Sequence, residues 1–99
     1  MDSERSEEAF KFMNNHPTIL VSEDIIFWAF RYALPRKTYA VTDAVRAILT
    51  NWKHLSENTK NLIVKEIIEE IDSGRMSYID KPDWESVLDM AGSEGNSHR

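Results

Sequence analysis

The sequence predicts an all-α protein, a single small bundle of about five helices, and three observations support this. First, residues that cap helix N-termini stand directly before apolar segments at several points of the chain. Second, the apolar residues within those segments recur every three or four positions, which is the period of an amphipathic helix. Third, the chain has 99 residues, of which 41% are apolar, and this is enough for one domain with one core.

The first helix is expected over residues 6–15. Ser6 can serve as its N-cap, and Pro17 forces the preceding residue out of the helical region. We expect residues 1–5 to be disordered. The next segment, "TILV" at 18–21, could form an extended strand, but the sequence shows no second strand to pair with it. A buried connector or a lead-in to the next helix is therefore favoured.

The second helix, expected over residues 22–34, has the clearest signals. Ser22 precedes two acidic residues, which suit the positive end of the helix dipole, and Pro35 ends the helix. Its segment "IIFWAFRYAL" is apolar nearly all round, so we expect it to be buried on several sides. The third helix is expected over 38–54 with Thr38 as N-cap, and a later threonine followed by an acid offers a rival start.

The fourth and fifth helices complete the predicted bundle. The fourth is expected over residues 56–73, because Ser56 is a suitable N-cap and Gly74 stands where a left-handed C-cap residue is needed. The fifth is expected over residues 81–91. Asp80 can cap it, a proline lies in its first turn, and another acid follows three residues after the cap.

These helices form one predicted domain over residues 6–91. The tail, residues 92–99, is small and polar with nothing to bury, so we expect it to be disordered. The three tryptophans fall among the apolar positions of different helices and are interpreted as core residues that could form one aromatic cluster. The predicted core consists of Trp28, Val45, Ile48, Trp52, Leu62, Ile63, Ile67, Trp84 and Leu88.

The composition excludes several classes of protein. The absence of cysteine removes disulfides, thiolate metal sites and cysteine nucleophiles. No apolar run approaches the roughly 20 residues that cross a bilayer, and the acidic N-terminus lacks the basic and then apolar layout of a signal peptide. We therefore expect a cytoplasmic protein with no membrane partner.

The net charge of −5 is unevenly distributed along the chain. Residues 31–65 carry seven bases and two acids, a net charge of +5, whereas residues 1–30 and 66–99 carry −4 and −6. This basic segment could face a polyanion, or it could pair with the acidic ends inside one fold. Pairing is favoured, because overall acidity opposes non-specific binding to nucleic acid.

Catalytic motifs are not evident in the sequence. The histidines, His16, His54 and His98, form no zinc-helix motif, and the glycines match no phosphate-binding loop. Glu66 and Glu70 share a helical face and could hold a divalent cation or act as an acid–base pair. A solvated helix face is the favoured interpretation of that pair. We expect no enzyme activity, no metal and no cofactor.

The best candidate site lies at the junction of the second and third helices. The segment "RYALPRKTY" combines three cations with two tyrosines around a helix break. Arginine and tyrosine are enriched among interface hot spots and also suit phosphate contact with base stacking. The alternative is a polar turn with no binding role, which is the commoner case. The candidate binding residues are Arg31, Tyr32, Arg36, Lys37 and Tyr39.

Two segments together resemble a group of small proteins encoded by bacteriophages and mobile elements. They are "DIIFWAFRYALPRKTYAVTDAV" and "NWKHLSENTKNLIVKEIIEEI", and the similarity covers roughly residues 18–90. The shared pattern has glycine where this chain has Pro35, so the turn there must differ, because proline cannot adopt the left-handed conformation that glycine allows. No established activity accompanies the group.

The resemblance implies a non-catalytic accessory protein that works in the cytoplasm of an infected bacterial host. Such a protein would bind and inhibit or modulate a host, defence or phage protein. The alternative is a nucleic-acid-associated helical module that uses the basic segment 31–65. A metal-dependent enzyme built on Glu66 and Glu70 is a third hypothesis. The sequence indicates neither the oligomeric state nor the identity of the partner.

Overall fold

The predicted all-α fold is confirmed by a computed structural model, which is 82% helical. It describes residues 2–35, 40–76 and 81–95, and the side chains of residues 4–35, 43–76 and 81–92; no strand occurs in these ranges. The elements are α1 (Asp2–Asn15), α2 (Glu23–Ala33), α3 (Ala40–Asn51), the 3₁₀ turn η1 (Trp52–His54), α4 (Glu57–Ser73) and α5 (Lys81–Gly95). None of the helices within the described part of the chain is long and apolar enough to span a membrane.

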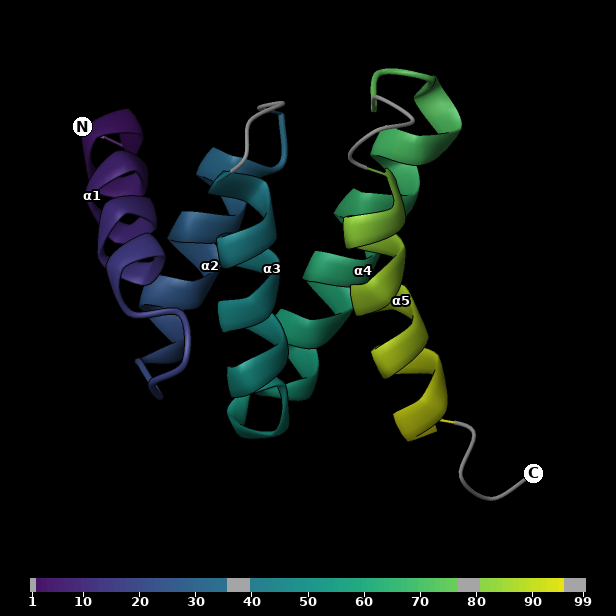
Figure 1. Cartoon of the computed structure of the whole chain (residues 1–99). Helices are drawn as coiled ribbons and strands as arrows, with labels where there is room; N and C mark the ends of the chain where they lie inside the picture. Colours follow the sequence, from purple (N-terminus) through teal and green to yellow (C-terminus); the bar gives the residue numbers. More distant parts are fainter. Residues whose placement is uncertain (1, 36–39, 77–80, 96–99) are drawn as a thin grey trace.

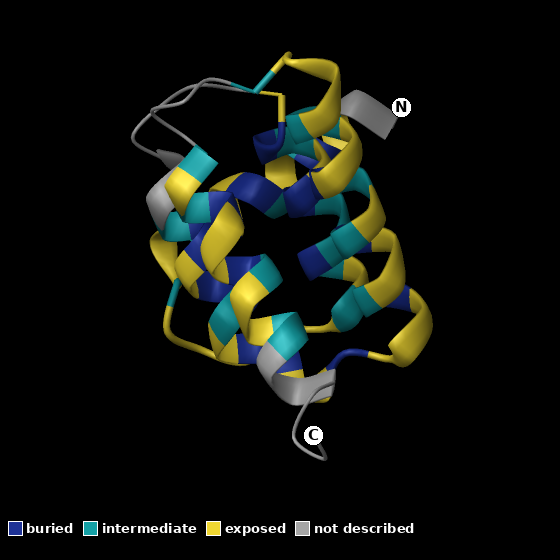
Figure 2. Ribbon diagram, turned by 90° about the vertical axis from the view of Figure 1, so that its right-hand side faces the viewer, coloured by how far each residue is buried: buried dark blue, intermediate teal, exposed yellow. Residues whose placement is uncertain are grey.

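Consecutive helices run in opposite directions, so the bundle is built up and down (Figure 1). α2 and α3 occupy its centre: α2 contacts α1, α3 and α4, and α3 contacts α1, α2 and α5. Buried residues lie on the sides of the helices that face one another, and exposed residues lie on the outside (Figure 2). The core therefore runs through the bundle between α2 and α3 and their neighbours.

Local capping signals position two of the helices as predicted. The Ser22 hydroxyl accepts a hydrogen bond from the Ile25 backbone N–H at 3.3 Å. The Ser56 hydroxyl accepts one from the Thr59 backbone N–H at 3.2 Å. Gly74 ends α4 with a φ of 78°, in the left-handed region that glycine tolerates best. Both serine caps and the glycine stop are thus confirmed, whereas the predicted caps Thr38 and Asp80 lie outside the described residues.

Three predicted helix boundaries are wrong. α1 begins at Asp2, so Ser6 is a buried residue inside the helix and residues 2–5 are helical where disorder was expected. α3 ends at Asn51, and the chain tightens into η1 before α4 begins. α5 continues past the predicted end to Gly95, so the first part of the predicted tail is helical.

Of the two roles predicted for residues 18–21, the buried connector is wrong, whereas the segment does lead into α2. The segment after α1 is neither strand nor helix, and Ile19 and Leu20 are exposed, with Leu20 at 59%. The physical reason is that the connector is attached through its backbone, whose polar groups bond to Asn51, and only Val21 packs against the core.

The core prediction is right for most residues and wrong for three. Leu62 is exposed, and Trp28 and Leu88 are only partly buried. The tryptophans do not form one cluster: Trp84 meets Phe30 edge-on at 5.6 Å between ring centroids, while Trp28 lies beside Phe27 on the outer side of α2. The predicted core residues that are buried are Val45, Ile48, Trp52, Ile63, Ile67 and Trp84.

Asn51, at the end of α3, attaches the connector to the bundle. Its side chain is fully buried. Oδ1 accepts a hydrogen bond from the Val21 backbone N–H at 2.8 Å, and Nδ2 donates to the carbonyl oxygens of Ile19 at 3.1 Å and Ala47 at 2.8 Å. The amide therefore bonds to backbone groups on both sides of Leu20 in the connector, and it holds the start of α2 against the end of α3.

Glu23 connects the start of α2 to the start of α4. The Ser56 backbone N–H donates to Glu23 Oε1 at 2.6 Å. Hydrogen bonds from the Ser56 hydroxyl, the Ser56 backbone and the Thr59 hydroxyl, in that order of effect, hold the pKa of Glu23 below its ordinary value of 4.5. A carboxylate at this position also faces the positive end of the α4 dipole. Asn51 and Glu23 thus join α2, α3 and α4 at one end of the bundle.

Replacing the buried amide should destabilise the fold. We expect Asn51→Ala to lower the free energy of unfolding by about 1–3 kcal/mol, because the Val21 N–H is left without its partner. Asn61→Ala, at an exposed position of α4, is the matched control and should change it by less than about 0.5 kcal/mol. Urea denaturation measures both values. Equal midpoints for Asn51→Ala and the wild type would show that the amide does not hold the connector.

The Glu23 contact should depend on pH. A lowered pKa means that the contact stabilises the fold fully above the unfolded value of 4.5 and is lost as the pH falls through the folded pKa. We therefore expect Glu23→Ala to lower the melting temperature at pH 7 and to differ much less from the wild type at pH 3. Thermal melts followed by circular dichroism at both values test this, with Glu69→Ala on the exposed side of α4 as control. A difference that stays constant with pH would contradict it.

Candidate functional site

The side of α2 that faces away from the core carries the candidate site. Ile26, Ala29, Phe30 and Ala33 point inward and are fully buried. The opposite side, which we call the outer face of α2, consists of Asp24, Phe27, Trp28 and Arg31. These positions recur at intervals of three and four, so they share one stripe of the helix. The two aromatic residues are partly exposed, and the charged residues at each end are exposed.

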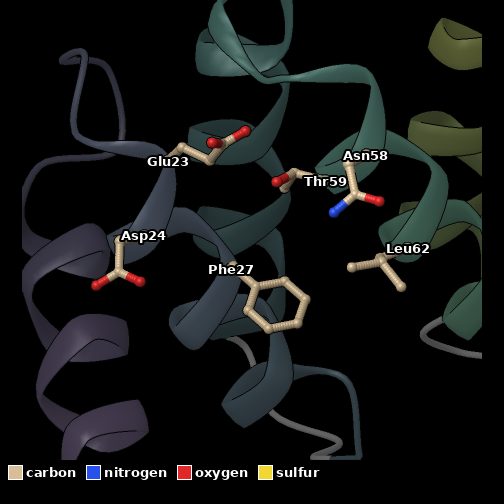
Figure 3. A pocket seen from close by; sticks show the side chains of 6 residues that line it. All are labelled: Glu23, Asp24, Phe27, Asn58, Thr59 and Leu62. Atoms are coloured by element: carbon tan, nitrogen blue, oxygen red, sulfur yellow. The ribbon is translucent and has the colours of Figure 1, made fainter.

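A hollow of about 270 Å³ separates the outer face of α2 from α4. Figure 3 shows Phe27 of α2 on one side of this α2/α4 hollow and three side chains of α4 on the other, Asn58, Thr59 and Leu62. Leu62 is 38% exposed here because α4 turns Ile63 and Ile67 into the core. The α2 side of the lining is completed by Glu23 and Asp24.

A second hollow, of about 250 Å³, lies between α1 and α2. Trp28 forms part of its wall, with the Arg5 guanidinium 5.0 Å from its ring centroid. Phe12 lies on the α1 side, is exposed, and stacks on His16 at 4.6 Å between ring centroids. The full lining of this α1/α2 hollow is Arg5, Glu8, Ala9, Phe12, Asp24, Ile25 and Trp28.

The outer face of α2 is acidic at one end and basic at the other. Asp24, in the first turn, forms an ion pair with Arg5 of α1. Arg31, in the last turn, lies 3.7 Å from Glu66 of α4, and its guanidinium is 5.5 Å from the Phe27 ring centroid. The aromatic pair therefore lies between a carboxylate and a guanidinium, and each of these charges is partly neutralised by a neighbouring helix.

The structure describes two of the five predicted binding residues. Arg31 lies on the outer face of α2, as given above. Tyr32 is partly buried and packs on Phe10 of α1, with ring centroids 4.9 Å apart, so it belongs to the α1–α2 contact. The other three predicted binding residues, Arg36, Lys37 and Tyr39, lie outside the described residues.

The carboxylates considered for metal chemistry are engaged with arginines. Glu66 faces Arg31, and Glu70 Oε1 lies 3.2 Å from Arg75 Nη2. Within the described ranges, no group of three or more histidine, aspartate or glutamate side chains comes together as a metal site would require. In this fold the two carboxylates thus form ion pairs with arginines.

The sequence prediction missed the aromatic surface itself. Leu62 and Trp28 were assigned to the core by helical period alone, which finds a stripe of apolar residues but not the edge of that stripe. One signal was present: α2 is apolar nearly all round. A helix at the centre of so small a bundle has too few neighbours to cover every side, so part of its apolar surface must remain accessible.

No protein-family model, curated protein or solved structure matches this chain. The resemblance to small phage proteins therefore stays a prediction, and the candidate site rests on the geometry of α1, α2 and α4.

Proposed function

We propose that this protein acts without catalysis, by binding another protein through the outer face of α2 and the hollows on either side of it. The observation that carries the proposal is the partial exposure of Phe27 and Trp28, adjacent on one helix and each forming a wall of a hollow. Aromatic residues are the commonest anchors of protein interfaces, and hollows next to them accept the partner's side chains.

The surroundings of the aromatic pair fit the same purpose. Arg31 supplies a third residue of a type enriched in hot spots. Leu62 and Phe12 extend the apolar surface onto the neighbouring helices, and Arg5, Glu8 and Asn58 provide polar groups around it. An apolar centre with a polar rim is the usual anatomy of a protein-binding surface.

The resemblance to phage and mobile-element proteins suggests the setting of this binding. On that basis the partner is a host, defence or phage protein that is inhibited or modulated in the cytoplasm of an infected bacterium. The outer face of α2 gives this proposal a surface that mutations can test.

The nucleic-acid alternative draws less support from the described residues. Its basis is the basic segment 31–65, whose affinity would come from phosphate neutralisation. In the described part of the chain, three of the seven cations in that segment lie near carboxylates: Arg31 at 3.7 Å from Glu66, Arg46 at 3.9 Å from Asp43, and Lys60 at 3.8 Å from Glu57. These acids reduce the positive potential that a polyanion would meet. A steep loss of binding with added salt would favour nucleic acid, and a weak salt dependence would favour protein contact.

Two variants on α4 test the proposed function. Leu62→Ser removes a wall of the α2/α4 hollow, whereas Ile68→Ser is a matched control, because the two side chains are 38% and 43% exposed on the same helix. The immobilised wild type is used to recover a partner from lysates of infected and uninfected bacteria. With that partner purified, we expect Leu62→Ser to weaken binding about tenfold or more and Ile68→Ser to leave it unchanged, as measured by calorimetry. Wild-type affinity for both variants, or equal losses, would contradict the proposal.

A further inference from the structure

The outer face of α2 has an order of charges that is complementary to itself. Along the helix the order is Asp24, then Phe27 and Trp28, then Arg31. The spacing is symmetric: each charged residue is three or four positions from the aromatic pair. When two such helices lie antiparallel, the aromatic pairs meet at the centre, and the acidic end of each helix lies beside the basic end of the other. A second copy in antiparallel orientation would therefore place Asp24 opposite Arg31 of the partner subunit.

We infer that the chain forms a symmetric homodimer in which the outer faces of two α2 helices pack antiparallel. The inference rests on the proposed use of this face as a protein-binding surface and names a second copy as an occupant. A two-fold axis makes both charge pairs equivalent and brings the aromatic residues together at the centre, which is the arrangement of an isologous interface. Charge complementarity across such an interface fixes the orientation of the two helices.

The shape of the surface suits this pairing. Phe27 lines the α2/α4 hollow and Trp28 lines the α1/α2 hollow, and we call this aromatic pair between the two hollows the ridge of α2. In the dimer the ridge of each copy occupies the α2/α4 hollow of the other, so both apolar surfaces are removed from water by one symmetric contact. The hollow supplies an apolar wall, Leu62, and a polar one, Asn58, which can bond at the rim.

Asp24 and Arg31 are exposed enough to form a second ion pair across the interface, in addition to the pair that each forms within its own chain. The side chains of Asp24 and Arg5 are 61% and 58% exposed, and that of Arg31 is 49% exposed. A carboxylate accepts several hydrogen bonds and a guanidinium offers five donors, so the pairs within one chain do not exhaust them. Across the interface, the charges would alternate in sign from Arg5 through Asp24 to Arg31 and Glu66 of the partner subunit. The charges of this network sum to zero. Because salt screens the attraction between them, the dimer should dissociate more readily at high salt.

Charge reversal with complementation tests the dimer. Sedimentation velocity of the wild type from about 1 to 500 µM should show a dimer whose fraction rises with protein concentration. Asp24→Arg and Arg31→Asp should each raise the dissociation constant about tenfold or more, since like charges then face each other. An equimolar mixture of the two variants should dimerise more tightly than either variant alone, because opposite charges meet again at both positions across the interface. The double variant Asp24→Arg with Arg31→Asp should also dimerise more tightly than either single variant, although each new side chain then faces a like charge, Arg5 or Glu66, within its own chain.

A control variant and a check of folding show whether a loss of dimer comes from this face. Arg75→Asp removes another exposed arginine that is paired with a carboxylate on α4, and it should not affect dimerisation. Circular dichroism checks each fold, and if a reversal unfolds the chain, Asp24→Asn and Arg31→Gln replace it and should still weaken the dimer. A wild type that stays monomeric throughout the range overturns the inference. So does a dimer that survives both reversals, since it would use another surface.

The same variants separate this inference from the proposed function. If the wild type is monomeric but Leu62→Ser still loses the heterologous partner, only the dimer is wrong. If the dimer behaves as expected while Leu62→Ser binds the heterologous partner normally, the proposed function is wrong and the face serves self-association alone.

Discussion

The position of α2 depends on the buried amide of Asn51. A single side chain at the end of α3 bonds to both Ile19 and Val21 of the connector, and so sets where the chain turns into α2. An Asn without these partners would be costly to bury, so the bonds favour this placement of the connector against α3. Glu23 then extends the arrangement to α4 by accepting from Ser56. The end of the bundle where α3 ends and where α2 and α4 begin, the lower end in Figure 1, is thus held by polar contacts.

This attachment explains why apolar surface remains on the outside. With its start held between α3 and α4, α2 turns its small and aromatic residues inward, where Ala29 and Phe30 are fully buried. The helix has more apolar residues than its inward side can hold. Phe27 therefore lies beside the hollow toward α4, and Trp28 lies beside the hollow toward α1. Polar residues are the common occupants of the outer side of a helix in a small bundle. The retained aromatic pair is the physical basis for proposing a binding surface.

Local signals made most of the fold predictable, whereas packing decided the rest. Ser22, Ser56 and Gly74 act on their own helix ends, so their roles can be inferred without knowing the tertiary structure. The side of α4 that faces the core depends on its neighbours, and this is why the prediction buried Leu62 together with Ile63. Of the predicted binding residues, Arg31 lies on the outer face of α2, and its role in binding stays a prediction. The sequence prediction missed the hollows, which arise between helices distant in the sequence.

The central claim is that the aromatic residues on the outer face of α2 are accessible to solvent, whereas the tryptophans of the core are buried. Acrylamide quenching of tryptophan fluorescence tests this directly, because Trp28 is partly exposed whereas Trp52 and Trp84 are buried. In dilute solution, below the concentrations at which copies associate, the account predicts one quenchable tryptophan population, which disappears in Trp28→Phe. Quenching that is unchanged in Trp28→Phe, or distributed over all three tryptophans, would contradict the account.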